Sequence, residues 1–134
     1  MMDGWCLPKY LLSMQANDIN SLIARLKQAE TLTHYWHLRT TSYARHLALG
    51  KFYEKLQGLT DALVESHIGM YGVRPEIPES ISLSKPEDHE VFLKDLGEYI
   101  DMYITIFNKD LPVQDHLLDI RNLINKTLYL FTLA

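Results

Sequence analysis

The fold is decided by residues 17–71, which read NDINSLIARLKQAETLTHYWHLRTTSYARHLALGKFYEKLQGLTDALVESHIGMY. An α-helix turns by about 100° per residue, and at that spacing the apolar residues after Ile19 fall on one face. The pattern predicts one helix over residues 17–38, capped by Asn17 or Asp18, and a second helix over residues 43–68. Thr40, Thr41 and Ser42 form the turn between them, so the two helices should make an antiparallel hairpin.

Polar residues interrupt the apolar face of the first helix. Glu30, Thr33 and His37 lie on that face, and His34 lies at its edge. A buried carboxylate or imidazole is costly unless another group satisfies it. Two interpretations stay open: these residues bond to each other or to a core hydroxyl, as most buried polar groups do, or they belong to a metal site.

The second helix carries its carboxylates on a different face from its apolar residues. Asp61 and Glu65 are one turn apart and could share a cation. Lys51, Lys55 and Gln57 lie on the same face, so an ordinary solvated surface is the simpler interpretation unless that face meets another subunit. Gly50 offers room for close approach of another helix, as does Gly58. The predicted apolar face consists of Leu49, Phe52, Tyr53, Leu56, Leu59 and Leu63.

The remaining sequence predicts two more helices. Residues 1–16 form an apolar lead that we expect to be a loop or short helix, and residues 69–85 form a proline-containing crossover. A third helix is expected over 86–107, capped by Ser84, and a fourth over 112–132. Their predicted inner faces are Phe92, Leu96, Tyr99, Ile100, Tyr103, Ile106 and Phe107, and Val113, Leu117, Ile120, Ile124, Thr127 and Phe131.

Short first and third connections and a long second one predict a left-handed, all-α, antiparallel four-helix bundle with a long crossover, which is the ferritin-like arrangement. The chain has 134 residues, enough for a single domain over residues 1–134. The inner faces of the third and fourth helices carry no central carboxylate, and no Glu-x-x-His occurs in the sequence. A di-iron site inside one bundle is therefore not expected.

Composition narrows the function classes. The net charge of −4 gives no reason to expect nucleic-acid binding. The single cysteine, Cys6, excludes an intrachain disulfide and a cysteine-rich zinc site. We find no signal peptide pattern and no apolar run of the ~18 residues that a membrane span needs, so a cytoplasmic protein is expected. Tyr35 and Trp36 lie outside the apolar face and are expected at an interface, whereas His67 and His89, near helix ends and exposed loops, receive no role.

One segment resembles a known family. Residues 37–56 read HLRTTSYARHLALGKFYEKL, and an Asp-x-x-x-Glu motif, Asp61 to Glu65, begins fifteen residues beyond His46. This pattern resembles the Dps family of mini-ferritins, and residues 123–133 look like the last helix of that family. The resemblance is closer still to small Dps-like proteins of tailed bacteriophages, which share Ser-Tyr-Ala-x-His-x-Ala-Leu-Gly-x-Phe-Tyr-Glu, here residues 42–54.

The resemblance implies a homo-oligomer, a dimer or a larger shell, that binds and oxidises Fe(II) between subunits, with zinc as a substitute metal. Matched residue by residue, His37 and His46 of one subunit would face Asp61 and Glu65 of the other, with Glu30 or His34 assisting. No catalytic side chain is assigned apart from these ligands. The phage-type likeness also allows a non-enzymatic bundle that acts in assembly or partner binding without metal, in the host cytoplasm if phage-encoded.

Four departures from the Dps pattern matter. The turn between the first two helices is shorter than in that family, and Leu38 replaces the usual Trp. Gly50 stands where the family carries an acid one turn after the second His. The lysine-rich tail that some members use on DNA is absent, since only Lys9 precedes the first helix.

Overall fold

The computed structural model of the chain describes residues 9–83 and 88–133, which form four α-helices and no strand. The helices are α1 (Lys9–Arg39), α2 (Tyr43–Tyr71), α3 (His89–Ile106) and α4 (Leu111–Phe131). They pack against one another, so the predicted all-α four-helix bundle is confirmed. None of these helices, as far as they are described, combines the length and the apolar character that crossing a bilayer requires.

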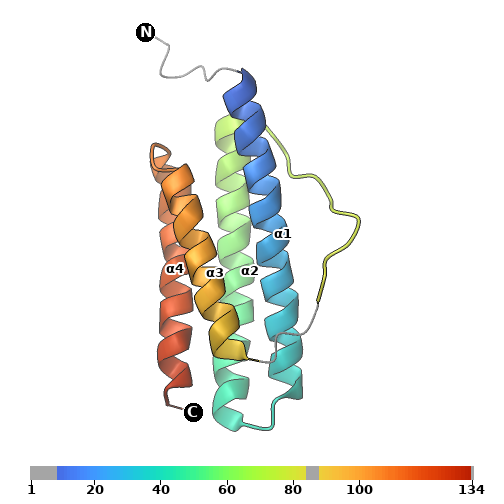
Figure 1. Cartoon of the computed structure of the whole chain (residues 1–134), viewed down its shortest axis with the longest axis vertical. Helices are drawn as coiled ribbons and strands as arrows, with labels where there is room; N and C mark the ends of the chain where they lie inside the picture. The colour runs from blue at the N-terminus through green and yellow to red at the C-terminus, as the bar shows by residue number, and fades with distance from the viewer. Residues whose placement is uncertain (1–8, 84–87, 134) are drawn as a thin grey trace.

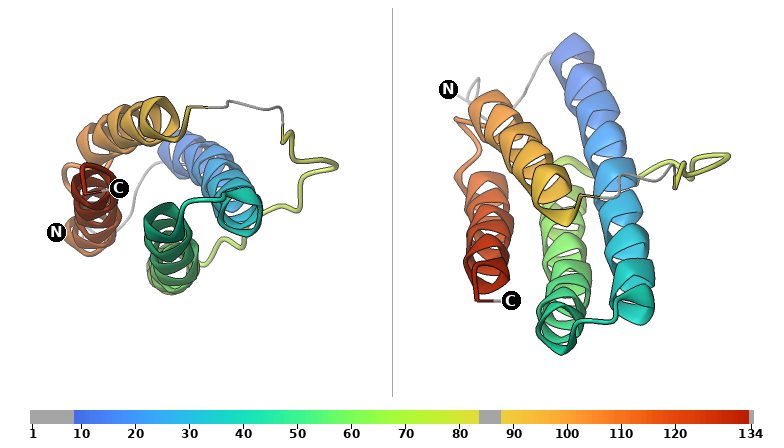
Figure 2. Two further views of the ribbon diagram at one scale, coloured as in Figure 1. Left: turned by 90° about the horizontal axis from the view of Figure 1, so that it is seen from below. Right: turned by 60° about the horizontal axis from the view of Figure 1, so that its bottom comes forward.

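The four helices form a ring in which every neighbour is antiparallel (Figures 1 and 2). α1 packs on α2, α2 on α4, and α4 on α3. The ring closes between α1 and α3, where the ring of Trp36 meets Phe92 edge-on at 5.2 Å. α1 and α4 run in one direction, and α2 and α3 in the other, because the long second connection returns the chain to the opposite end of the bundle (Figure 1).

This crossover lies beside α1. Its residue Glu76 donates a backbone N–H to the Asn20 side chain at 3.0 Å, and the Gln28 amide donates to the carbonyl of Ser82 at 2.9 Å. Leu83 packs against the core. The crossover is therefore held to α1 by polar side chains, since its prolines leave it without regular structure of its own.

Side chains and a glycine define the helix ends. Ser42 caps α2 by accepting from the N–H of Arg45, and Gly72 ends α2 at a φ of 69°, a conformation that favours glycine. Asp88 caps α3 and Asp110 caps α4. The predicted start of α2 is correct, but its end falls at Tyr71 rather than at residue 68. The predicted Ser84 cap lies outside the described residues.

The predicted start of the first helix is wrong. α1 begins at Lys9 and passes through Asn17 and Asp18, which therefore do not cap it. Residues 9–16 contain Lys, Leu, Met, Gln and Ala and no Gly or Pro, so their helical propensity carries the helix through the two polar residues. The segment expected as a separate lead is in large part the first two turns of α1.

The core follows the predicted faces for the most part, and several residues depart from them. Leu93 is fully buried although it was not on the predicted face, and Ile106 is exposed although it was. Trp36, which was expected at an outer interface, is only 9% exposed and packs against α3. The fully buried apolar centre consists of Leu22, Leu26, Ala29, Leu49, Phe52, Leu56, Leu63, Leu93, Leu96, Ile100, Val113, Leu117, Ile120 and Ile124.

One glycine makes room for an ion pair between α3 and α4. A Cβ on Gly97 would lie 2.1 Å from a guanidinium nitrogen of Arg121, so only glycine fits there without displacing that group. The guanidinium donates to both carboxylate oxygens of Asp101, at 3.0 and 3.2 Å, and to Asn125 at 3.0 Å. Gly58, in contrast, has no atom within 4 Å of an added Cβ.

We expect Gly97→Ala and Gly58→Ala to differ in their effect on the free energy of unfolding. Alanine at Gly58 should raise the free energy of unfolding by about 1 kcal/mol, because alanine is the better helix former and meets open space. Alanine at Gly97 should lose that gain, because the Arg121 guanidinium must leave Asp101. Urea unfolding of both variants measures the difference, and equal stabilisation by both would contradict the account.

Candidate functional site

His37 and His46 form an interlocked pair across the α1–α2 turn. The Nδ1 atom of His37 lies 2.7 Å from the backbone carbonyl oxygen of His46, and the Nδ1 atom of His46 lies 2.8 Å from the carbonyl oxygen of His37. Their rings stack with centroids 3.8 Å apart and an interplanar angle of 17°. Each imidazole is thus tied to the helix that carries the other.

These hydrogen bonds fix the tautomer of both rings. A carbonyl oxygen only accepts, so each Nδ1 must carry the proton. When the ring is neutral, its Nε2 then holds a lone pair. Histidines that bind metals are commonly oriented in this way, with the other ring nitrogen donating to a backbone carbonyl.

The stacking also limits how the pair could bind a metal. The lone pair of an imidazole nitrogen lies in the plane of its ring, and the planes of two rings that stack with centroids 3.8 Å apart and lie only 17° from parallel do not converge near the rings. The two histidines therefore cannot chelate one ion in this arrangement. Each could supply one ligand to a separate ion.

Gly50 is the residue that allows the pair to form. A Cβ at this position would lie 2.9 Å from Cε1 and 3.0 Å from Nδ1 of His37. The imidazole of His37 therefore occupies the space on α2 in which a larger side chain would stand. Gly50 stands where the Dps pattern carries an acid. The glycine leaves the space that the His37–His46 pair needs, in addition to removing a possible ligand. The close approach expected at Gly50 is made by a side chain rather than by a helix.

A groove between α1 and α2 continues from this pair. The ring of Tyr53 stacks on His34 at 4.1 Å and lies 5.4 Å from His37. The groove has a volume of about 460 Å³. It is lined by Glu30, Thr31, His34, Tyr35, Leu38, Tyr53 and Gln57. The assisting residues predicted from the sequence, Glu30 and His34, therefore share one groove beside His37.

The position of Glu30 in this groove is unfavourable for a charged carboxylate. Its side chain is 12% exposed; one carboxyl oxygen contacts the Lys27 ammonium at 3.4 Å, and the other is buried without a hydrogen-bond partner among the described residues. The hydroxyl of Thr60 lies beside it but donates its own hydrogen to the carbonyl of Leu56. Burial raises the pKa of Glu30 above its ordinary value of 4.5, and Asp61 adds to the rise while Lys27 opposes it.

Asp61 and Glu65 lie apart from the histidine pair. Both are exposed on α2, one turn from each other, and Asp61 is close enough to Glu30 to act on its charge. Within the described residues, no three His, Cys, Asp or Glu side chains gather closely enough to hold a metal ion. One chain therefore brings together His37 and His46, and Glu30 with Asp61, but does not bring these two pairs into one centre.

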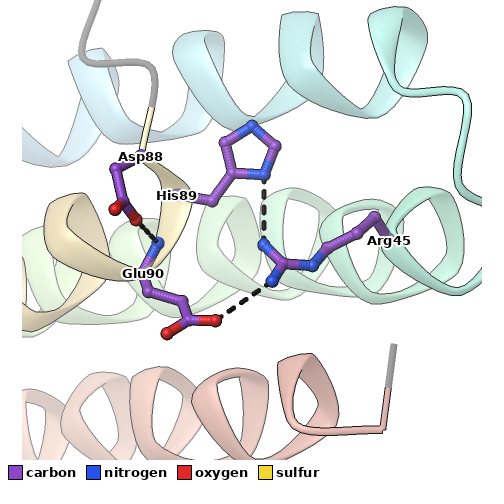
Figure 3. A pocket seen from close by; sticks show the side chains of 4 residues that line it. All are labelled: Arg45, Asp88, His89 and Glu90. Atoms are coloured by element: carbon purple, nitrogen blue, oxygen red, sulfur yellow. Dashed lines mark hydrogen bonds and ion pairs between the residues drawn. The ribbon is translucent and has the colours of Figure 1, made fainter.

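Two histidines to which the sequence assigned no role are embedded in the structure. His67, expected near an exposed loop, is only 2% exposed, and burial lowers its pKa, while Asp110 opposes the shift. His89 stacks on Trp36 at 4.4 Å and faces Arg45 in an open hollow of about 620 Å³ (Figure 3). Only the helical position of Trp36, one residue before His37, could have indicated that α3 would cover this side of the turn.

The fold and these contacts define an antiparallel four-helix bundle. Its candidate functional side chains, the His37–His46 pair and the groove beside it, lie near the α1–α2 turn. A family model matches residues 37–131, which is more than half of the chain, and the chain belongs to that family, a family of unknown function (DUF5856). The matched segment begins at His37 and includes His46, Gly50, Asp61 and Glu65. Comparison with curated proteins and with solved structures gave no match.

The role assigned to Gly50 predicts a contrast between two glycines of the same helix. Gly50→Ala should fail to gain the ~1 kcal/mol that Gly58→Ala gains, because its methyl group displaces the His37 ring from the carbonyl of His46. Thermal unfolding measures the stability. A gain at Gly50 equal to that at Gly58 would show that the histidine pair does not depend on this space.

The burial of Glu30 predicts a stabilising substitution. Because its folded-state pKa is raised, the folded chain binds the proton more tightly than the unfolded chain, and stability is lost as the pH rises from 4.5 through the folded-state value. Glu30→Gln removes that loss, so the variant should be more stable than the native protein at pH 7.5 and lose this advantage toward pH 4. Midpoints of urea unfolding at both pH values test this prediction. A variant less stable than the native protein at pH 7.5 would contradict the destabilisation assigned to the Glu30 carboxylate.

Proposed function

We propose that this protein binds Fe(II), or Zn(II) in its place, at a site shared between two subunits on the α1–α2 face, in the manner of a Dps-like mini-ferritin. The observation that carries the proposal is the interlocked pair of His37 and His46, whose crossed hydrogen bonds leave both Nε2 atoms as lone-pair donors. Oxidation of the bound Fe(II) by dioxygen is the reaction that the resemblance implies.

The donor set suits these metals. Imidazole nitrogen combined with carboxylate oxygen is a common environment for Fe(II) and Zn(II), whereas Mg(II) prefers oxygen ligands alone. A histidine nitrogen binds metal only through its lone pair, so protons compete with the metal and affinity should weaken as the pH is lowered. Parallel rings give each ion one imidazole, and the remaining ligands must then be carboxylates.

A second subunit would supply those carboxylates. Asp61 and Glu65 are exposed and lie apart from the histidine pair in their own chain. A two-fold axis across the α1–α2 face would bring Asp61 and Glu65 of the partner subunit toward the histidines, and the same axis would form an identical second site. The half-exposed Tyr35 and the exposed Leu38 at this end of α1 would gain cover in such a dimer.

The alternative function is a bundle that acts in assembly or partner binding without metal. Its support is that one chain holds no group of three metal-ligating side chains among the described residues. Large apolar side chains are also exposed around the turn, at Leu38, Tyr43 and Leu47. A protein of this kind would still dimerise or bind a partner, but its histidine pair would only fix the hairpin.

A metal titration separates the two functions. Chelator-treated protein is titrated with Zn(II) by calorimetry and with Fe(II) by following its oxidation optically, while light scattering gives the mass. We expect native protein and the Gly58→Ala control to bind and oxidise, and a His37→Ala, Asp61→Ala double variant to lose at least tenfold in affinity, as when metal ligands are removed. Background binding and oxidation in all three proteins would leave only the alternative.

Mixing tests whether the site is shared. The single variants His37→Ala and Asp61→Ala should each lose both sites of the dimer. After unfolding and refolding together, the mixed dimer should regain one intact site, because one subunit then supplies the histidines and the other the carboxylates. No recovery in a mixture that light scattering and native mass show to contain mixed dimers would contradict a site between subunits.

A further inference from the structure

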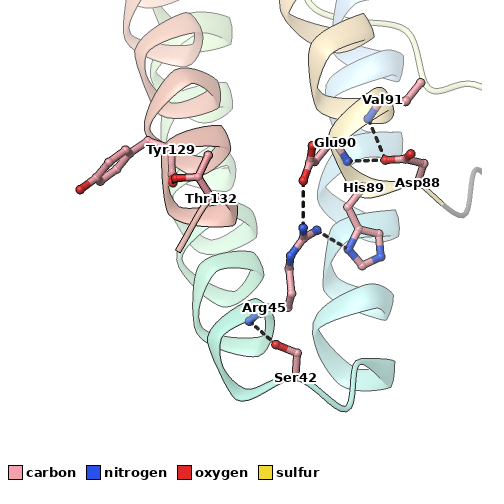
Figure 4. A network of polar contacts seen from close by, with 8 residues as sticks. All are labelled: Ser42, Arg45, Asp88, His89, Glu90, Val91, Tyr129 and Thr132. Carbon is pink, nitrogen blue, oxygen red and sulfur yellow. Dashed lines mark hydrogen bonds and ion pairs between the residues drawn. The ribbon is translucent and has the colours of Figure 1, made fainter. Parts of the chain in front are cut away.

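All four helices meet at a second polar cluster, on the side of the α1–α2 turn away from the groove. We call it the Arg45 cluster; it consists of Trp36, Arg45, His89, Glu90 and Phe131 (Figure 4 shows its polar members). The guanidinium of Arg45 lies over the Phe131 ring at 4.0 Å and donates to the Glu90 carboxylate at 3.1 Å. Arg45 thereby connects the first turn of α2 with the start of α3 and the end of α4.

His89, the first residue of α3, is the acceptor in this cluster. Its Nδ1 lies 3.4 Å from a guanidinium nitrogen of Arg45, and because arginine can only donate, Nδ1 must carry the lone pair. The opposite contact is the stack on Trp36 of α1, at 4.4 Å. The neutral imidazole is thus placed between an arginine and a tryptophan, and it anchors the first turn of α3 to both.

Protonation of His89 would break this arrangement. The lone pair that accepts from Arg45 would be lost, and two cations would face each other in a partly buried place. The charged groups around the ring are Arg45 from α2 and the carboxylates of Asp88 and Glu90 from α3, whereas α1 and α4 present the neutral rings of Trp36 and Phe131. Burial, and then Arg45, lower the pKa of His89 from its ordinary 6.5, and Asp88 opposes them.

We infer that the Arg45 cluster is an acid-released latch: protonation of His89 breaks the contacts of its ring with Arg45 and Trp36 and loosens the first turn of α3, which the Arg45–Glu90 ion pair continues to hold. Asp88 keeps its hydrogen bonds to the N–H groups of Glu90 and Val91, so the helix cap itself survives the release. The movement is confined to the junction of α3 with α1 and α2. The open hollow beside Arg45 gives the released segment room to move without disturbing the core.

The sign of the pH dependence follows from this geometry. In the unfolded chain the imidazole takes up a proton near pH 6.5, and in the folded chain only at lower pH. The stabilising contribution of the latch is therefore complete above pH 6.5 and is lost as the pH falls below it. Neutralising Arg45 removes the opposing charge, so His89 should then protonate at higher pH than in the native protein.

Trp36 reports the state of the latch directly, because an imidazolium in contact with an indole ring quenches its emission. In the full chain with Trp5→Phe, Trp36 is the remaining tryptophan. We expect its emission to fall in one step below pH 6.5, the step to vanish in His89→Gln, and to move to higher pH in Arg45→Gln. His116→Gln, which changes another histidine on α4, should leave the step in place.

Hydrogen exchange locates the release. After correction for the intrinsic rate, amides of the first turn of α3 should exchange about tenfold faster at pH 5.5 than at pH 7.5 in the native chain, with no such change in His89→Gln. Persistence of the emission step in His89→Gln, or unchanged exchange at the start of α3, would overturn the inference. If Arg45→Gln fails to fold, His89→Gln alone still decides it.

Discussion

The crossed hydrogen bonds between His37 and His46 are the constraint on which this end of the molecule depends. They join α1 to α2 next to the loop that connects the two helices, and they fix the rotation of each helix about its own axis at this end. Consecutive residues of a helix point about 100° apart. Once His37 faces the groove, Trp36 must face α3, and once His46 is paired, Arg45 must face α3 and α4. The groove and the Arg45 cluster are therefore two sides of the same hairpin.

Several residues of this arrangement lower the free energy of unfolding of the protein. Gly50 gives up helical propensity so that the His37 ring can fit. One carboxyl oxygen of Glu30 is buried and has no hydrogen-bond partner among the described residues, and burial lowers the pKa of His67 and of His89. A bundle selected only for stability would replace such residues, whereas sites that bind or switch commonly retain them. The same residues lie within the groove or between helices, where binding of a ligand, a second subunit or a proton could offset this loss of stability.

Much of the fold could be predicted from periodicity, because four apolar faces and their turn residues define four helices. The start of α1 could not, since Asn17 and Asp18 look like caps but lie within a run of good helix formers. Trp36 and Ile106 were misplaced because the start of α3 covers Trp36, whereas Ile106 is the last residue of α3, and neither bound of that helix follows from the apolar pattern. For the site, the sequence indicated His37 and His46, and Glu30 and His34 of the groove, but not the crossed hydrogen bonds, the ring stacking or the role of Gly50. Those depend on the rotation of two helices relative to each other, which helical spacing alone does not determine.

The central claim is that the crossed hydrogen bonds hold a proton on Nδ1 of both His37 and His46, so that the lone pair of each ring in its neutral form is on Nε2. Long-range proton–nitrogen correlation spectra of the histidine rings test it most directly, with the six histidines assigned by His→Gln substitution. At pH 7.5 both rings should show a protonated Nδ1 and an unprotonated Nε2, and adding Zn(II) should shift the Nε2 signals of these two rings. Nε2-protonated rings, or Nε2 signals that do not respond to saturating Zn(II), would contradict the account.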